Sequence, residues 1–387
     1  MDLSTRLTHI TPSLTLSIDS KAKALRAEGI DVCSFAAGEP DFDTPEHIKA
    51  AAITALENNL TRYTAVAGIP ELRQAIAHKF LTENQLEYQP EEIIVSNGAK
   101  QSCFNAIMAC VGEGDEVIIP APYWTSYPEM VRLAGAEPVI VPTTAANHWK
   151  ITAADFENAM SPRTKMIIIN SPGNPTGAVY TKEELRAIAE VAADEEIFIL
   201  SDEIYESLVY DEAQHVSTAS VTPEARDLTI TINGFSKAYA MTGWRLGYLG
   251  APKKIARAIE ALQSHSSSNA CSFGQYGALA ALQNSQQCVA DMREEFNIRR
   301  EYMFNRLHKM HQISVTKPLG AFYVLADIAK FGMSSTNFAD RLLSKSNVAV
   351  IPGIAFGNDK TIRLSYAVGM DVIKEGLDRL EDFCKTL

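Results

Sequence analysis

Short apolar runs alternate with amphipathic helical patterns from about residue 45 to residue 285. Most of these runs lack alternating polar residues, as is typical of strands that are buried on both faces of a sheet. The runs that predict strands are Ile93–Ser96, Glu116–Pro120, Pro138–Pro142, Met166–Asn170, Ile197–Ser201 and Leu228–Asn233. Strands that alternate with helices predict an α/β fold, with a mostly parallel sheet flanked by helices.

Helix signals lie between and beyond these runs. Pro70 precedes the helical pattern of Glu71–Leu81, and Thr181 with Glu184 predicts a capping box for the next helix. After about residue 285 the pattern changes to a long charged helix, a strand and a further helix. Their predicted ranges are Asp291–His311, Gly320–Asp327 and around Asn337–Ser346.

The length of 387 residues suggests two or three domains. We expect a large domain over residues 45–285, and a smaller α+β domain that combines residues 1–44 with residues 286–387. The net charge is −12, and acidic and basic residues are interspersed. An acidic chain without a basic stripe is a poor candidate for binding nucleic acid or an anionic membrane, so any anionic substrate needs local cations.

The six cysteines are scattered without a CxxC pair, which is typical of reduced thiols in a cytoplasmic enzyme. No run approaches the ~18 apolar residues of a membrane span, and the N-terminus lacks the apolar region of a signal peptide. His308 and His311 form an HxxH pair without an acidic or cysteine companion. An exposed helical pair explains them better than a metal site does, and we expect no metal.

Polar motifs follow four of the predicted strands. Gly98, Ala99 and Lys100 begin a helix whose free backbone amides can bind phosphate, although a plain βα turn looks the same. Asn174 lies in a proline-rich turn after Met166–Asn170. Asp202 follows Ile197–Ser201, where a lone aspartate usually caps the next helix.

The fourth motif ends in Ser236-Lys237 and stands eight residues before Arg245. An amine buried at a strand end has a lowered pKa and is a usable nucleophile, whereas an isolated loop lysine usually points to solvent. Ser236, Arg245 and the nearby glycines favour the nucleophile. All four motifs lie at carboxyl ends of predicted parallel strands, where open α/β sheets bind ligands, so we expect a single site.

These motifs resemble the class I aminotransferases of fold-type I, which use pyridoxal 5′-phosphate (PLP). The resemblance rests on Asn174-Pro175-Thr176-Gly177, Asp202 with Tyr205, Ser236-Lys237 and Gly243-x-Arg245-x-Gly247, and it extends over essentially the whole chain. It includes the segments Ala37–Phe42 and Arg363–Ser365. It is strongest to bacterial-type aspartate aminotransferases, including those that also accept prephenate.

The resemblance implies a role for each motif. Lys237 would hold PLP as a Schiff base and then move the proton between the substrate Cα and the cofactor. Asp202 would keep the pyridine nitrogen protonated, and Asn174 and Tyr205 would hydrogen-bond the phenolic oxygen. Trp124 would stack on the ring, although an ordinary core aromatic is its simpler interpretation.

The phosphate carries about −2, and a helix N-terminus offers only about +0.5, so a cation is needed. The resemblance assigns that cation to Arg245. It completes the phosphate site with Gly98, Ala99, Lys100, Ser236 and Tyr63. Tyr63 would come from the neighbouring subunit, which implies a homodimer. Gly234 stands where many members of the family have another phosphate-binding serine.

For the substrate, the resemblance pairs Arg363 with the α-carboxylate, assisted by the Gly38 amide, with Trp124 and Asn174 beside it. Arg363 could instead be a structural ion pair. The distal carboxylate would meet a separate set of groups, namely Lys100, Thr15 and the adjacent Ser13. Lys100 could also be an exposed helical lysine. The resemblance further implies cis bonds at Ala121–Pro122 and Asn174–Pro175.

The expected reaction is ping-pong transamination of L-aspartate and 2-oxoglutarate to oxaloacetate and L-glutamate. A prephenate, aromatic or broad-range aminotransferase is the nearest alternative, and a PLP-dependent β-lyase is a more distant one. A PLP-binding regulator is also open, but every catalytic position is filled and no DNA-binding module is predicted.

Overall fold

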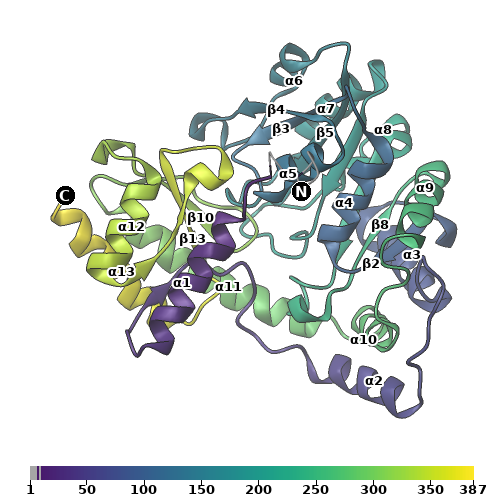
Figure 1. Ribbon diagram of the computed structural model, residues 1–387, viewed down its shortest axis with the longest axis horizontal. Coiled ribbons are helices and arrows are strands. Elements are labelled where there is room, and N and C mark those ends of the chain that lie inside the picture. Colours follow the sequence, from purple (N-terminus) through teal and green to yellow (C-terminus); the bar gives the residue numbers. More distant parts are fainter. Residues whose placement is uncertain (1–6, 8–9) are drawn as a thin grey trace, which may run out of the picture.

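The computed structural model describes residue 7 and residues 10–387, and it has two lobes (Figure 1). The larger lobe contains a seven-stranded sheet in the order β2-β8-β7-β6-β5-β3-β4. Its strands are β2 (Ile93–Ser96), β3 (Glu116–Ala121), β4 (Glu137–Pro142), β5 (Thr164–Asn170), β6 (Phe198–Asp202), β7 (Thr229–Gly234) and β8 (Gly247–Gly250). The six predicted strands are confirmed, with small shifts at their ends. β8 was not predicted, and it runs antiparallel to both β2 and β7.

Both faces of this sheet are buried. On β5, for example, Ile167 and Ile168 are each fully or almost fully buried but belong to core clusters on opposite faces. One face packs against α4 (Ala99–Cys110), α5 (Ser126–Leu133) and α9 (Lys253–Ser264). The other packs against α6 (Ala153–Ala159), α7 (Lys182–Asp194) and α8 (Pro223–Leu228). The continuous apolar runs of the sequence therefore reflect burial on both sides, as predicted.

Three further helices extend this lobe beyond β2 and β8. They are α2 (Glu46–Glu57), α3 (Pro70–Asn84) and α10 (Ser272–Gln283). α2 lies at the lower right margin in Figure 1 and packs against α10. The capping box predicted for α7 is confirmed, because Thr181 Oγ1 accepts from the Glu184 amide at 3.3 Å and Glu184 Oε2 accepts from the Thr181 amide at 2.8 Å.

The smaller lobe contains an antiparallel sheet in the order β12-β13-β10-β9. Its strands are β9 (Ser314–Val315), β10 (Tyr323–Asp327), β12 (Ile351–Pro352) and β13 (Thr361–Ser365). Around it lie α1 (Leu14–Ala27), α12 (Ser335–Ser346) and α13 (Met370–Lys385), with the parallel pair β1 (Cys33–Ser34) and β11 (Val348–Ala349). Segments from both ends of the chain thus build this lobe.

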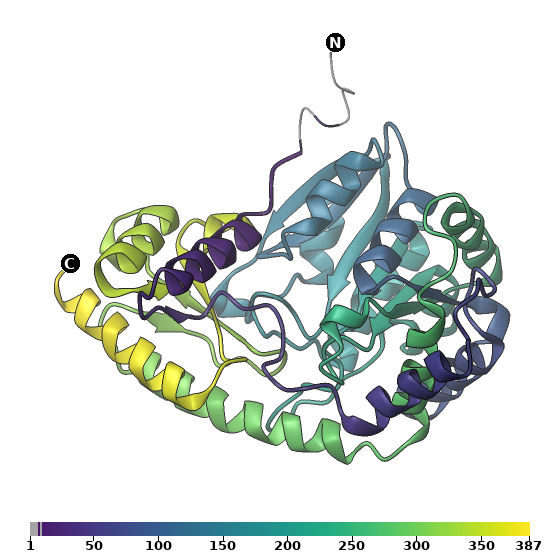
Figure 2. The ribbon, with the colours of Figure 1, turned by 60° about the horizontal axis from the view of Figure 1, so that its bottom comes forward.

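The long helix α11 (Gln287–His308) links the two lobes along one side of the molecule, as Figure 2 shows. It begins earlier and ends earlier than predicted. The predicted strand over Gly320–Asp327 begins only at Tyr323, because Ala321 has a left-handed backbone with φ 58°. Both expected cis bonds are present, and Ser171–Pro172 is a third that was not predicted. No helix within the described residues is long and apolar enough to cross a membrane.

Candidate active site

A cavity of about 440 Å³ opens at the carboxyl ends of β5, β6 and β7, between the two lobes. All the site residues predicted from the sequence line it except Gly98 and Tyr63. Those that do are Ser13, Thr15, Gly38, Ala99, Lys100, Trp124, Asn174, Asp202, Tyr205, Ser236, Lys237, Arg245 and Arg363. The structure therefore brings residues from distant parts of the sequence into one site.

Lys237 lies three residues beyond the end of β7, with its side chain half-buried. Its Nζ donates a hydrogen bond to the Gly38 carbonyl at 2.6 Å. Burial lowers the pKa of Lys237 to about 8, and the nearby cations Arg245 and Arg363 add to the effect while Glu39 opposes it. An amine with this pKa is partly neutral near pH 7, which is what a nucleophile or a proton acceptor requires.

Asp202 is the last residue of β6 and is almost completely buried. Its Oδ2 accepts a hydrogen bond from the Tyr127 hydroxyl at 2.6 Å, and its Oδ1 accepts one from the Ile204 amide at 3.2 Å. Burial raises the pKa of Asp202, and these two hydrogen bonds oppose the rise. The residue can therefore present a carboxylate in a largely dry environment.

An anion-binding cradle lies beside Lys237. Gly98 has φ 84° and stands at the N-cap of α4, so the Ala99 and Lys100 amides are at a helix N-terminus. A Cβ at Gly98 would collide with the guanidinium of Arg245. Arg245 also donates to the Thr242 carbonyl at 2.8 Å, and Ser236 is buried nearby. Amides, a cation and a hydroxyl thus surround one small volume.

Arg363, on β13, is 3% exposed although it carries a guanidinium. It donates to Asn174 Oδ1 and to the Ala36 carbonyl, each at 3.0 Å. It takes part in none of the ion pairs found among the described residues, and its Nε has no hydrogen-bond partner there. A structural ion pair, the alternative role for Arg363, therefore has no acidic partner among the described residues. A buried cation of this kind is suited to an anionic ligand.

The remaining predicted residues lie around these groups. The Tyr205 hydroxyl shares a hydrogen bond of 3.0 Å with Tyr323. Lys100 Nζ lies 5.0 Å from the centre of the Trp124 ring, and burial and Arg245 lower the pKa of Lys100. On the small-lobe side, Ser13 caps α1 and its hydroxyl lies 2.8 Å from that of Thr15.

Tyr63 lies apart from the cavity. Its side chain is 91% exposed, and the apolar residues Ile53, Leu56 and Leu60 of the same region are also exposed. A single chain therefore leaves Tyr63 outside the site. Its predicted place in the site of a neighbouring subunit stays a prediction.

The family model for aminotransferase class I and II matches residues 30–380. The chain belongs to this family. The aminotransferase is 48% identical to an aspartate aminotransferase of Bacillus sp. strain YM-2, over 99% of each chain. It is also 48% identical to a probable aspartate/prephenate aminotransferase of Aquifex aeolicus, over 98% of each chain. Its structure matches that of Thermus thermophilus aspartate aminotransferase with maleate, with a TM-score of 0.95, 42% identity and full coverage of both chains.

The cofactor of this aminotransferase is PLP, and the residues present fit it. The cofactor needs an amine, an anion near the ring nitrogen and a site for a phosphate. Lys237, Asp202 and the cradle at Gly98 supply these three features within one cavity. The positive-φ glycine packed against Arg245 is the decisive detail, because a side chain there would displace the guanidinium that the phosphate requires.

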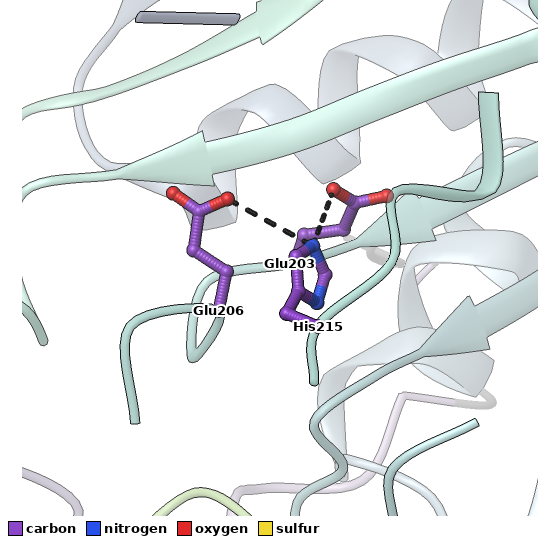
Figure 3. Close-up of side chains that lie close together, drawn as sticks. All are labelled: Glu203, Glu206 and His215. Carbon is purple, nitrogen blue, oxygen red and sulfur yellow. Dashed lines mark hydrogen bonds and ion pairs between the residues drawn. The ribbon is translucent and has the colours of Figure 1, made fainter. Parts of the chain in front are cut away.

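A further cluster lies near the site but has a different character. His215 Nε2 lies 3.1 Å from Glu203 Oε2 and 3.8 Å from Glu206 Oε2 (Figure 3). Lys79 and Asn84 also donate to Glu206, and Ser201, Ser217 and the Thr218 amide donate to Glu203. The carboxylates of Glu203 and Glu206 are thus satisfied by donors from the protein. The cluster is a buried hydrogen-bond network.

Sequence reasoning missed this network and the two donors to Asp202, Tyr127 and Cys103. His215 stands twelve residues from Glu203 in a segment without a motif, and Lys79 lies on α3. Tyr127 and Cys103 come from α5 and α4. Only the proximity of Tyr127 to the Pro122-Tyr123-Trp124 segment could have suggested it.

Proposed function

We propose that the chain catalyses transamination between L-aspartate and 2-oxoglutarate, giving oxaloacetate and L-glutamate by a ping-pong route. One observation carries this proposal. A single cavity contains the half-buried amine of Lys237, the buried carboxylate of Asp202 and two cations, Arg363 and Lys100, that are available to a substrate with two carboxylates. The names of the relatives point to the same reaction.

Bound PLP supplies an electron sink for the electron pair left at the substrate Cα when its proton departs. Lys237 Nζ would hold the cofactor, and its amine would take up and return the proton of the substrate Cα. Asp202 keeps the ring nitrogen protonated. Asn174 and Tyr205 hydrogen-bond the phenolic oxygen, and Trp124 packs against the ring. Further contacts hold the phosphate, made by Gly98, Ala99, Lys100, Ser236, Arg245 and Tyr63.

The substrate α-carboxylate binds Arg363, with the Gly38 amide assisting. Asn174 already orients this guanidinium through Oδ1, so its Nδ2 is left to donate. The distal carboxylate binds Lys100, Thr15 and Ser13, which line the other parts of the cavity. A relative of the same fold was solved with maleate, itself a dicarboxylate, which supports this arrangement.

The active unit is a homodimer in which Tyr63 reaches the partner's site. The exposure of Tyr63 and of the nearby apolar residues Ile53 and Leu56 supports a covered surface there. We also propose that residues 45–285 form the large domain, and residues 1–44 with 286–387 a small domain that closes over the substrate. All six cysteines are free thiols, in keeping with a cytoplasmic location.

Prephenate is the second candidate substrate, because relatives 42–48% identical carry the name aspartate/prephenate aminotransferase or its probable form. Like aspartate and 2-oxoglutarate, prephenate has two carboxylates that could meet Arg363 and Lys100. Its ring would need room beside Trp124. The two functions therefore share one anchoring scheme.

The deciding experiment is a panel of donors and acceptors that includes aspartate, glutamate, aromatic amino acids, 2-oxoglutarate and prephenate. We expect the highest kcat/KM for aspartate with 2-oxoglutarate. Release of pyruvate and ammonia without any acceptor would instead indicate a β-lyase. The variant Lys237→Ala should lose both transamination and the pH-dependent visible band of the bound cofactor, and an unchanged band would refute the role of Lys237.

A further inference from the structure

Asp202 is held by side chains that no sequence motif indicated. The Tyr127 hydroxyl donates to Asp202 Oδ2 at 2.6 Å, and the Cys103 thiol approaches the same oxygen at 3.8 Å. The other oxygen, Oδ1, accepts one described hydrogen bond, from the Ile204 amide at 3.2 Å. The two carboxylate oxygens of Asp202 are therefore in different environments.

Both side-chain donors are buried, and burial favours their protonated forms. Tyr127 is 2% exposed and Cys103 is 0% exposed. Burial and the adjacent Asp202 raise the pKa of each group well above its ordinary value. Both groups therefore hold their protons more tightly than usual beside Asp202. Each donates to Asp202 Oδ2, and a donor stabilises the ionised form of its carboxylate partner.

The groups around Asp202 act on its pKa in opposite directions. Burial is the largest influence and raises the pKa of Asp202, and Glu203, the next residue, acts in the same direction. Tyr127, the Ile204 amide and Cys103 lower it, in that order. Among the cationic groups of the cavity, the amine of Lys237 interacts with Asp202, whose charge raises the pKa of Lys237. Tyr127 is thus the strongest side-chain influence that favours a carboxylate.

Tyr127 also contacts the aromatic wall of the site. Its ring packs edge-on against Trp124, with centroids 5.2 Å apart and an interplanar angle of 85°. Tyr127 itself lines the cavity and lies on α5, whereas Asp202 lies on β6. One side chain thus fixes the position of the carboxylate relative to the ring that lines the cofactor site.

We propose that Tyr127 is a positioning residue that holds Asp202 as a carboxylate through Oδ2 and leaves Oδ1 for the protonated ring nitrogen of PLP, with Cys103 as a weaker second donor. This inference rests on the proposed role of Asp202 in cofactor binding. It assigns a function to two residues outside the recognised motifs. It also predicts that their loss changes cofactor binding without changing how the substrate carboxylates are held.

The test compares Tyr127→Phe and Cys103→Ala with the wild-type enzyme. Phenylalanine keeps the packing on Trp124 and removes only the hydroxyl. Binding of pyridoxamine phosphate, which forms no bond to Lys237, is measured by equilibrium dialysis. The hydrogen bond to a charged group predicts an increase of about tenfold in its dissociation constant for Tyr127→Phe, and of only about twofold for Cys103→Ala because a thiol is a weak donor.

Steady-state kinetics provide the second readout. For Tyr127→Phe we expect kcat to fall by about tenfold or more while KM for aspartate changes by less than about twofold, because Arg363 and Lys100 are untouched. The variant Asp202→Asn should change both readouts in the same direction and further. Equal losses in kcat and in substrate binding would overturn the positioning role.

Tyr88→Phe is the matched control. Tyr88 is also buried, at 3% exposure, and its hydroxyl shares a hydrogen bond with Thr231 at 3.1 Å. This control should lower urea stability as Tyr127→Phe does, but leave cofactor affinity and kcat unchanged. If Tyr127→Phe behaves like Tyr88→Phe in all three measurements, Tyr127 is a packing residue and the proposal fails.

Failure of the proposed reaction would give a different result. A wild-type enzyme that binds pyridoxamine phosphate but does not transaminate aspartate would refute the substrate assignment. The dialysis comparison between Tyr127→Phe and Tyr88→Phe would still decide the role of Tyr127 in that case.

Discussion

Arg363 and Asn174 are joined by a hydrogen bond of 3.0 Å, from Nη1 of the guanidinium to the amide Oδ1, across the boundary between the two lobes. Arg363 comes from β13 of the smaller sheet, and Asn174 follows β5 of the larger one. The bond fixes the orientation of a buried cation without neutralising it. The guanidinium is therefore oriented in advance and still available for an anion.

The variant Arg363→Lys tests this interpretation. Lysine keeps the charge but cannot bind a carboxylate through two parallel hydrogen bonds or hold Asn174 at the same time. We expect kcat/KM for every amino donor to fall by about 100-fold, mainly through KM. The affinity for pyridoxamine phosphate should stay within about twofold of the wild type. A loss confined to dicarboxylates would show that Arg363 reads the distal carboxylate instead.

Lys100 should separate dicarboxylate donors from aromatic ones. Removing the amine in Lys100→Ala should raise KM for aspartate by about tenfold, because an ion pair with the distal carboxylate is lost, and should spare phenylalanine. Full kinetics with both donors provide the measurement. Equal losses for the two donors would indicate that Lys100 serves the phosphate or the fold. Lys165→Ala is a suitable control, because it removes a lysine outside the cavity.

The pKa of Lys237, about 8, has a direct consequence for reactivity. Below this value the amine is mostly protonated and unreactive, and above it the amine is mostly neutral. In the cofactor-free chain, acylation of Lys237 should therefore rise with pH through a midpoint near 8, whereas an ordinary lysine has a pKa of 10.5. Peptide mass spectrometry at a series of pH values measures this. Because Glu39 raises the pKa of Lys237, Glu39→Gln should move the midpoint lower still, and an unshifted midpoint of 10.5 would contradict the burial effect.

Shared active sites can be tested by mixing two inactive variants. In the proposed dimer, Tyr63→Ala removes a phosphate contact and Lys237→Ala removes the amine, but a hybrid dimer would contain one site with both groups. After reversible unfolding and refolding at low PLP, the mixture should regain about a quarter of wild-type activity, since half the dimers are hybrids with one intact site. Each variant refolded alone is the control. No gain on mixing would place Tyr63 outside the partner's site.

The sequence predicted the strands of the large sheet and the site at their carboxyl ends, because both follow from the local pattern of apolar and polar residues. Continuous apolar runs marked β5 and β6, and the polar residues Asn174 and Asp202 lie close to the ends of these runs. β8 escaped prediction because its four residues contain two glycines and overlap the motif that carries Arg245. A short glycine-rich strand has almost no pattern of its own, and only its pairing with β2 and β7 defines it.

Contacts between distant residues were also beyond the sequence. Nothing near Asp202 indicates that Tyr127 and Cys103 would reach its Oδ2, because those residues come from different helices. The network of His215, Glu203 and Glu206 is a further example, since its donors include Lys79 on α3. Resemblance could assign roles to motif residues, but the supporting donors depend on packing.

The antiparallel course of β8 limits where the chain can tolerate insertions. If the next strand ran parallel to β7, the chain would need a crossover of about a dozen residues or more to return to the other end of the strands. β8 instead starts at the end of the sheet where β7 finishes, so all twelve connecting residues, 235–246, stay at this end, and they carry both Lys237 and Arg245. A longer loop there would displace Lys237 and Arg245 together. We therefore expect length variation among active relatives to accumulate in other loops.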